Sequence, residues 1–171
     1  MNAPSRTSDV MSASSVIRSC TFRVGADCFA VPADVVIEVL RGSGALARVP
    51  LAPEAILGLL HLRGRIVPIL DPAVRVGVKR PTADTAATYL VVALDDDWYG
   101  LAIDEMLDVV EVPVDRIEEP RSPSTEGAAV TGVFAAPDRL VHLLDPQRMI
   151  QSPVRPRPQT PERLGVPHGR Q

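Results

Sequence analysis

The sequence predicts an all-β fold, and its composition and patterning lead to this prediction. Hydrophobic residues make up 46% of the 171-residue chain but aromatic residues only 4%, so Val, Leu, Ile and Ala must form the core. The β-branched members of this set pack well on a pleated sheet. The 17 prolines disfavour long helices, because each one removes a backbone donor. Short apolar runs separated by Gly, Pro and Asp complete a pattern of strands and tight turns.

The first half of the chain contains five expected strands and one helical turn. The strands are residues 21–24, 28–31, 35–40, 59–62 and 65–70. Arg63-Gly64 forms the turn of the second expected hairpin, where glycine adopts positive φ without steric cost. Residues 53–57 are expected to form one helical turn, since proline is tolerated at a helix start.

The second half repeats this scheme. Its expected strands are residues 89–94, 98–103, 107–112, 130–135 and 139–144. Residues 81–87 form a polar connection, residues 121–127 a loop, and residues 145–150 are expected to close the fold with a short helix.

Both ends of the chain are expected to lie outside the fold. Residues 1–16 form a serine-rich leader with too few apolar residues to fold, and residues 152–171 form a Pro/Arg-rich tail. The expected organisation is therefore a disordered leader at 1–16, a folded domain of two barrel subdomains at 17–151 and a disordered tail at 152–171. We interpret the tail as a solvated spacer rather than a segment that binds nucleic acid or membrane.

Charge and cysteine content give no indication of nucleic-acid binding, lipid binding or a disulfide framework. A formal net charge of −3 offers no global attraction to nucleic acid or anionic lipid. Cys20 and Cys28 are too few for a disulfide framework, and we interpret them as reduced core residues. The leader lacks the apolar stretch of a signal peptide, and no run approaches the ~18 apolar residues of a membrane span, so a cytoplasmic location without membrane insertion is expected.

Nothing in the sequence predicts a metal site, a cofactor or an enzyme. The histidines His61, His142 and His168 lack the spacing of metal ligands, and neither cysteine joins them. Cys28 has no credible base and orienting acid as a nucleophile. Trp98 is a more plausible hairpin core residue than a stacking platform for nucleic acid.

An internal duplication relates the two halves. Residues 58–72 align without gaps on residues 132–146. The identical pairs are Gly58/Gly132, Arg65/Arg139, Val67/Val141, Leu70/Leu144, Asp71/Asp145 and Pro72/Pro146. Upstream, Asp34 aligns with Asp104 and Glu38 with Asp108. The duplication predicts two similar small barrels, each marginal alone and stabilised by packing against the other.

The duplication also separates structural from functional features. Residues present in both copies serve the barrel, whereas a residue present in one copy needs another reason. The hairpin tip at residues 61–64 has Ala135-Ala136-Pro137-Asp138 as its counterpart, so the barrel does not require Arg63. Arg63 is therefore the strongest functional candidate that the sequence offers.

The order of several motifs resembles the CheW family. The motifs are Phe29-Ala-Val-Pro32, Val36-Ile-Glu38-Val, Arg48-Val-Pro50, Pro53-x-x-Ile56-x-Gly58, Leu62-Arg-Gly64-x-Ile-Val-Pro68-Ile-x-Asp71, Gly100-Leu-Ala-Ile-Asp104 and Leu140-Val-x-Leu-Leu-Asp145. The resemblance spans residues 19–150. It implies two five-stranded SH3-like β-barrels that share a hydrophobic interface. Departures from the family pattern include His61, which stands where the family often has Asn.

What the resemblance implies for function is an adaptor. Its expected partners are the cytoplasmic tip of a chemoreceptor and the regulatory domain of the histidine kinase CheA, with recruitment to membrane receptor arrays. The alternative is a CheW-like scaffold of a non-flagellar pathway that controls pili, gliding or a diguanylate cyclase. The receptor-binding residues it implies are Val36, Glu38, Leu62, Arg63 and Gly64.

Strand alternation assigns the residues around Glu38 to two faces. Val36 and Glu38 share one face of the expected strand, and Ile37 and Val39 share the other. Because a charged Glu38 is expected to be exposed, Val36 is predicted to be exposed as an apolar contact, while Ile37 is predicted to lie in the core.

Overall fold

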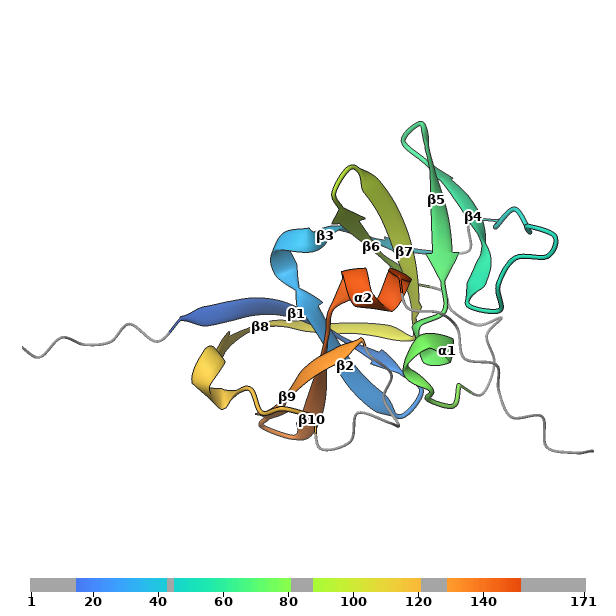
Figure 1. The fold of residues 1–171 in the computed structure, drawn as a ribbon. Coiled ribbons are helices and arrows are strands. Elements are labelled where there is room, and N and C mark those ends of the chain that lie inside the picture. Colours follow the sequence, from blue (N-terminus) through green and yellow to red (C-terminus); the bar gives the residue numbers. More distant parts are fainter. Residues whose placement is uncertain (1–14, 43–44, 81–87, 121–128, 152–171) are drawn as a thin grey trace, which may run out of the picture.

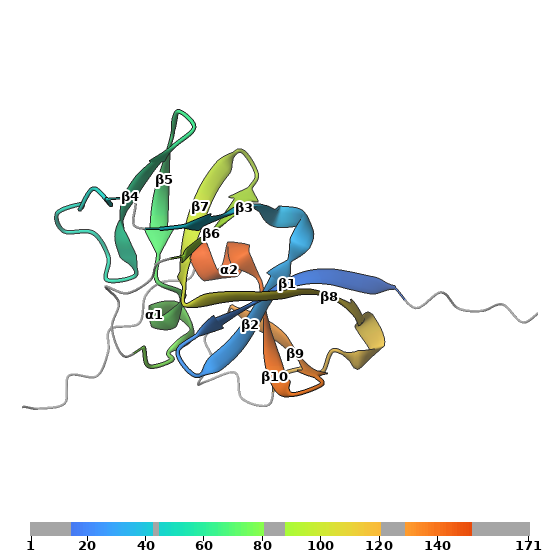
Figure 2. The ribbon, with the colours of Figure 1, turned by 180° about the vertical axis from the view of Figure 1, so that it is seen from behind.

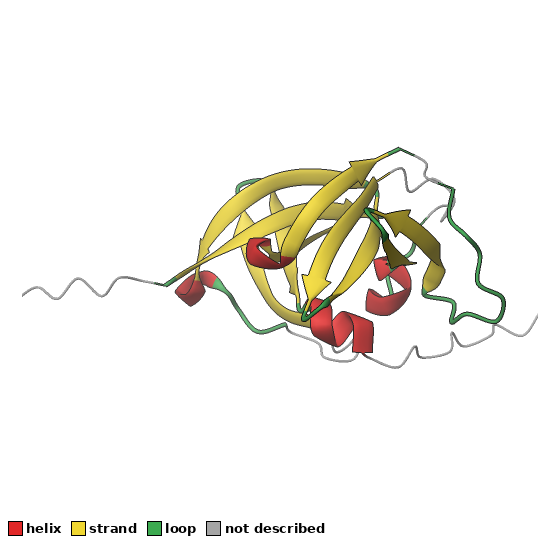
Figure 3. Cartoon of the chain, turned by 90° about the horizontal axis from the view of Figure 1, so that it is seen from above, coloured by secondary structure: helices red, strands yellow, loops and turns green. Residues whose placement is uncertain are grey.

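The computed structural model describes residues 15–42, 45–80, 88–120 and 129–151, and these form two five-stranded sheets (Figure 1). We name the first sheet barrel A and the second barrel B. In spatial order, barrel A comprises β8 (Glu105–Pro113), β1 (Val16–Val24), β2 (Asp27–Pro32), β10 (Arg139–Leu144) and β9 (Val130–Ala136). In spatial order, barrel B comprises β3 (Val36–Arg41), β6 (Thr88–Leu94), β7 (Asp97–Ile103), β5 (Arg65–Leu70) and β4 (Ile56–Leu62). The strongly curved strands are evident in Figure 3.

The predicted all-β class and all ten predicted strands are confirmed. The helical turn expected at residues 53–57 is wrong, because Ile56 and Leu57 already belong to β4. Only one hydrogen bond, from the Ile56 amide to the Pro53 carbonyl at 2.8 Å, marks a turn before it. The expected connections at residues 81–87 and 121–127 lie outside the described residues, as do residues 1–14 and 152–171.

Short helices follow the last strand of each copy. The one expected near the end of the domain is α2 (Pro146–Gln151), and its counterpart α1 (Pro72–Val76) was not predicted. Asp71 caps α1, since its carboxylate accepts a hydrogen bond from the Ala73 amide at 2.9 Å. The η1 (Ala33–Val35) and η3 (Val114–Arg116) turns complete the described elements. No helix in these ranges is long and apolar enough to span a membrane.

The two copies exchange hairpins. Barrel A combines the β1–β2 hairpin of the first copy with β8, β9 and β10 of the second, and barrel B combines β6–β7 with β3, β4 and β5. The expectation that each copy forms its own barrel is therefore wrong in its connectivity, although two barrels are present. Strand propensity and alternation do not encode the partner of a strand, so the exchange left no signal in the sequence pattern. Figure 2 shows the chain crossing between barrels at η1, between β2 and β3.

Features shared by the copies serve the barrels, as the duplication predicted. The Asp71 amide donates to the Ala55 carbonyl and the Asp145 amide to the Ala129 carbonyl, both at 2.8 Å. In barrel B, the segment after β3 forms a β-bridge between Ala47 and Leu59 of β4. In barrel A, the segment after β8 forms a β-bridge between Glu118 and Val133 of β9. These segments run over Gly58 and Gly132. A Cβ on Gly58 would lie 2.8 Å from the Ala47 carbonyl oxygen, and one on Gly132 would collide with Ile117.

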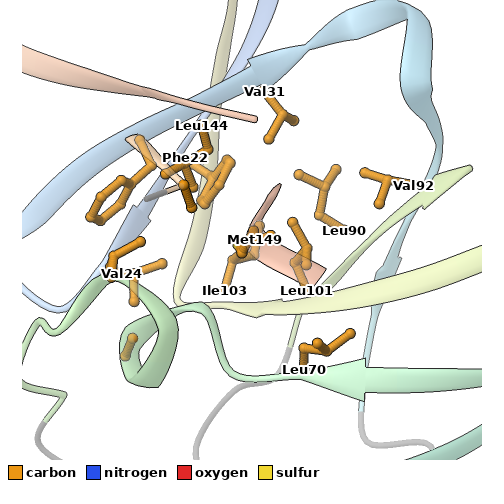
Figure 4. Packing of buried hydrophobic residues seen from close by; sticks show 14 of the residues in the cluster. Phe22, Val24, Val31, Leu70, Leu90, Val92, Leu101, Ile103, Leu144 and Met149 are labelled. Atoms are coloured by element: carbon orange, nitrogen blue, oxygen red, sulfur yellow. The ribbon is translucent and has the colours of Figure 1, made fainter. Parts of the chain in front are cut away.

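The largest hydrophobic cluster joins the barrels. Phe22 and Val31 from barrel A meet Leu90, Leu101 and Ile103 from barrel B (Figure 4). Met149 of α2, fully buried, completes this contact. Smaller clusters lie within each barrel, around Phe134 in barrel A and around Tyr89 in barrel B. The predicted hydrophobic interface between the two barrels is present.

Both cysteines are free, as interpreted from the sequence. Cys20 lies buried on β1 opposite Val31, and Cys28 lies half-buried on β2 opposite Arg23. Burial raises the pKa of the Cys20 thiol. Cys20 is therefore held as a neutral, unreactive core residue.

An ionic network around the buried Arg80 side chain links the two barrels. The Arg80 guanidinium contacts Asp71 at 3.3 Å, Asp104 at 2.8 Å and the Ala102 carbonyl at 2.8 Å. The Asp104 carboxylate also accepts a hydrogen bond from the Gly25 amide at 2.6 Å. Because Gly25 belongs to the β1–β2 turn of barrel A and Asp71 follows β5 of barrel B, this network clamps one barrel to the other.

Candidate functional site

The tip of the β4–β5 hairpin has a strained backbone. Leu62 pairs with Arg65, so the turn consists of Arg63 and Gly64 alone. Their φ angles are 49° and 79°. Positive φ at both central residues is the requirement of a type I′ turn, which glycine and asparagine satisfy and arginine satisfies at a cost. Arginine is therefore present at this position for a reason other than the turn.

The Arg63 side chain reaches across to the edge strand of barrel B. Its guanidinium forms an ion pair with Glu38 of β3 at 2.9 Å. The two partners differ in exposure, since the Arg63 side chain is 67% exposed and that of Glu38 only 19%. The structure thus brings together the two polar residues that the family resemblance singled out.

Glu38 retains an unused acceptor. Its Oε2 atom accepts the Arg63 hydrogen bond, whereas its Oε1 atom is buried and has no hydrogen-bond partner among the described residues. A buried carboxylate oxygen without a donor costs free energy, so a donor that reaches it gains more than one that binds an exposed carboxylate. The part of the pair that a partner can reach is therefore the exposed Arg63 guanidinium, whereas the unpaired Glu38 oxygen is covered by this chain.

A β-bulge overturns the predicted faces of β3. Val36 pairs with Val92 and Glu38 with Val91, so Ile37 has no partner of its own and simple alternation fails. Ile37 is 41% exposed, while Val36 is half-buried and packs against the core shared by the barrels. The predictions that Val36 is exposed and that Ile37 is a core residue are wrong. Sequence reasoning missed Ile37 as the apolar neighbour of Glu38, because a bulge has no signature in this run of residues.

The remaining predicted site residues lie at the same tip. Gly64 is exposed beside Arg63, and nothing lies within 4 Å of where its Cβ would be. Leu62 is half-buried and packs against the barrel B cluster together with Leu40 and Leu60. The tip therefore combines an exposed ion pair with a border of half-buried leucines.

The counterpart in barrel A lacks this arrangement. Pro137 and Asp138 form that turn between Ala136 and Arg139, and neither has positive φ. Arg139 instead donates to its neighbour Asp138 at 2.8 Å, which holds the pKa of that exposed carboxyl below its usual value. Asp108, the counterpart of Glu38, is exposed on β8. The polar pair is thus a feature of one barrel only.

The strained turn yields a stability prediction. Arg63→Asn is expected to raise the free energy of unfolding by about 0.5–1 kcal/mol, because asparagine adopts positive φ more readily. Urea denaturation measures this change. Arg65→Asn, at a neighbouring strand position of the same hairpin, is the control and is expected to give no gain. A lower stability for Arg63→Asn would show that the Glu38 ion pair outweighs the strain.

The described residues contain no group of three or more His, Cys, Asp or Glu side chains arranged to hold a metal ion.

Comparisons with known proteins agree with the geometry. The CheW-like domain family matches residues 18–154. The chain is 33% identical to the probable chemotaxis protein CheW of Rhizobium etli, with 72% of this chain and 81% of that protein covered. It is 30% identical to protein FrzA of Myxococcus xanthus, with 77% and 83% covered.

A solved structure supports the fold. The crystal structure of scaffolding protein TtCheW from Thermoanaerobacter tengcongensis superposes with a TM-score of 0.69 at 23% identity, covering 77% of this chain and 90% of that one. With ten strands in two barrels and a family match across nearly all described residues, the chain belongs to the CheW-like domain family.

Proposed function

We propose that this CheW-like scaffold couples chemoreceptors to the regulatory domain of the histidine kinase CheA, without catalysing a reaction itself. The Arg63–Glu38 pair is the receptor contact, and Ile37 and Leu62 border it. The observation that carries the proposal is Arg63 itself, which is exposed at 67% on a backbone that disfavours arginine and is absent from the matching hairpin of barrel A. We further propose that the protein acts in the cytoplasm and is recruited to receptor arrays at the membrane.

The energetics favour binding over folding as the role of the pair. An exposed ion pair contributes about 0–1 kcal/mol to stability. When a partner excludes water, a charge-assisted hydrogen bond contributes about 1.5–3 kcal/mol. The Glu38 side chain is already largely desolvated in the folded protein. A partner that covers Arg63 therefore has to remove water mainly from the guanidinium and not from both charges.

Arg63→Ala is expected to weaken binding to a purified receptor signalling fragment by about 10- to 100-fold, because one charge-assisted contact is lost. Isothermal titration calorimetry measures the affinity. Binding to the CheA regulatory domain is expected to stay unchanged, since the substitution affects the receptor contact alone.

Arg18→Ala is the matched control for this measurement. The Arg18 side chain is 68% exposed and pairs with Glu111 at 3.1 Å, so it reproduces the exposure and geometry of Arg63 on barrel A. Receptor affinity is expected to be unaffected by Arg18→Ala. Equal receptor affinity of the Arg63→Ala protein and the unaltered chain would refute the assigned contact.

A second candidate for the pathway in which this protein acts is a non-flagellar chemosensory system that controls pili, gliding or a diguanylate cyclase. The relatives include a protein named for chemotaxis and another, FrzA, that is not, and this supports considering both outputs. Deleting the gene and comparing swimming in soft agar with motility on a surface distinguishes the two outputs.

A further inference from the structure

Barrel B has a gap between two neighbouring strands, β5 and β7, which we call the notch. Barrel A has no such gap at the equivalent place, and the internal duplication shows which residues correspond. In barrel A, β10 and β2 pair at Val141–Cys28, His142–Phe29 and Leu143–Ala30. In barrel B, the equivalent strands β5 and β7 pair only at Ile69–Gly100 and Leu70–Leu101. The counterparts of the first two pairs of barrel A, Val67–Trp98 and Pro68–Tyr99, are not paired.

Proline explains why the strands separate. Pro68 stands where barrel A has His142, and proline has no amide hydrogen to donate across the ladder. The pairing of β5 with β7 therefore stops at Ile69. Figure 1 shows the two strands diverging toward the β4–β5 and β6–β7 turns. Between them lies a cavity of about 230 Å³, lined by Arg65, Ile66, Pro68, Asp97, Trp98 and Tyr99.

The lining of this notch combines the aromatic and apolar side chains Trp98, Tyr99, Ile66 and Pro68 with the charged side chains Arg65 and Asp97. Ile66 is 69% exposed, and Trp98 and Tyr99 are half-buried. The Arg65 guanidinium lies 4.8 Å from the centre of the Trp98 ring and donates to the Asp96 carbonyl at 3.0 Å. Asp97 lines the notch, and Asp95 and Asp96 are exposed next to it in sequence, at the β6–β7 turn.

An aromatic groove beside acidic residues suits a Pro-rich segment with arginines. Such segments bind as preformed polyproline II helices, with proline rings against the aromatic side chains and little loss of entropy. This chain carries a segment of that chemistry. Residues 152–171 include Arg155-Pro156-Arg157-Pro158 and hold four arginines against the single acid Glu162.

The segment starts close enough to reach the notch. It follows Gln151, the last residue of α2, and α2 contacts β6 of barrel B. Figures 1 and 2 both show α2 near β6 and β7. Twenty residues in polyproline II conformation span about 60 Å, whereas a folded domain of this size has a radius of gyration of only about 14 Å.

We propose that residues 152–171 bind the notch of their own chain. The prolines pack against Trp98, Ile66 and Pro68, and the arginines pair with Asp95, Asp96 and Asp97. This inference does not depend on the receptor contact, because it concerns the gap between β5 and β7 rather than the Arg63–Glu38 pair. The tail is then a ligand of the domain rather than the solvated spacer that its composition alone predicted.

Trp98 provides the readout, since it is the only tryptophan of the chain. The experiment is acrylamide quenching of its fluorescence in the full-length protein and in the variant Arg155→Ser/Pro156→Ala/Arg157→Ser/Pro158→Ala. A loss of protection in this variant is expected, seen as a larger quenching constant with an unchanged melting temperature. Asp95→Asn/Asp96→Asn/Asp97→Asn is expected to cause a similar loss, because asparagine keeps the turn but removes the charge.

Asp27→Asn is the control, because Asp27 is the exposed barrel A counterpart of Asp97, and it is expected to leave the quenching constant unchanged. The measurement is repeated over a wide range of protein concentration, and an intramolecular contact gives no concentration dependence. Identical quenching of the unaltered chain and the tail variant would overturn the proposal. Protection that disappears on dilution would also overturn it, because the tail of a second copy would then occupy the notch.

Discussion

Replacing Arg80 by alanine is expected to lower the free energy of unfolding by about 3–5 kcal/mol, because it leaves a buried carboxylate without its cation. The side chains of Arg80 and Asp71 are only 4% and 5% exposed. Without the guanidinium, Asp71 keeps the Ala73 amide as a donor but loses its counter-charge, and the Ala102 carbonyl loses a donor. Urea denaturation followed by circular dichroism measures the change.

An exposed ion pair serves as the control, because it shows how much of the lost stability is due to the burial of the Arg80 pair. Arg23 and Glu105 lie 2.7 Å apart with side chains about half exposed, so Arg23→Ala is expected to cost only about 0–1 kcal/mol. If Arg80→Ala cost no more than Arg23→Ala, the network would not clamp the two barrels together.

Phe22→Ala is expected to destabilise both barrels at once, by about 3–5 kcal/mol, because a fully buried aromatic ring leaves a cavity where they meet. Phe22 belongs to barrel A and Trp98 to barrel B. Since the copies exchange hairpins, neither barrel has a complete sheet without the other. The Trp98 fluorescence transition is therefore expected to shift to lower urea concentration together with the circular dichroism transition.

The two probes decide whether the barrels unfold as one unit. Coincident midpoints in the unaltered chain and in Phe22→Ala are expected. A Trp98 transition that stays in place while the circular dichroism transition moves would show that barrel B folds independently and that the hairpin exchange does not couple the barrels.

The strands could be predicted from the sequence because alternation and turn residues are local signals. The apolar runs on either side of Arg63-Gly64 predicted that hairpin, and the duplication predicted two barrels. The order of strands within each barrel could not be predicted, because β1 and β6 carry similar patterns and either suits the same neighbours. The unpredicted helix α1 had a signal in retrospect, namely the Asp71-Pro72 pair that matches Asp145-Pro146 at α2.

The candidate site was predicted in part. Arg63 was located by its absence from the second copy, and its partner Glu38 came from the family resemblance; the structure places them 2.9 Å apart. The exposure of Ile37 could not be predicted, because the bulge that causes it depends on how β3 meets β6. The Pro68 notch was equally hidden, since its effect on β5 becomes visible only when β5 and β10 are compared in space.

Recruitment of the kinase to receptors tests the central claim most directly. In a co-sedimentation assay, receptor-containing membranes, CheA and this protein are mixed, and the CheA that pellets with the membranes is measured. The unaltered chain is predicted to bring CheA into the pellet, whereas Arg63→Ala is predicted to leave CheA in the supernatant while still binding it in solution. Equal amounts of pelleted CheA with the unaltered chain and with Arg63→Ala would contradict the account.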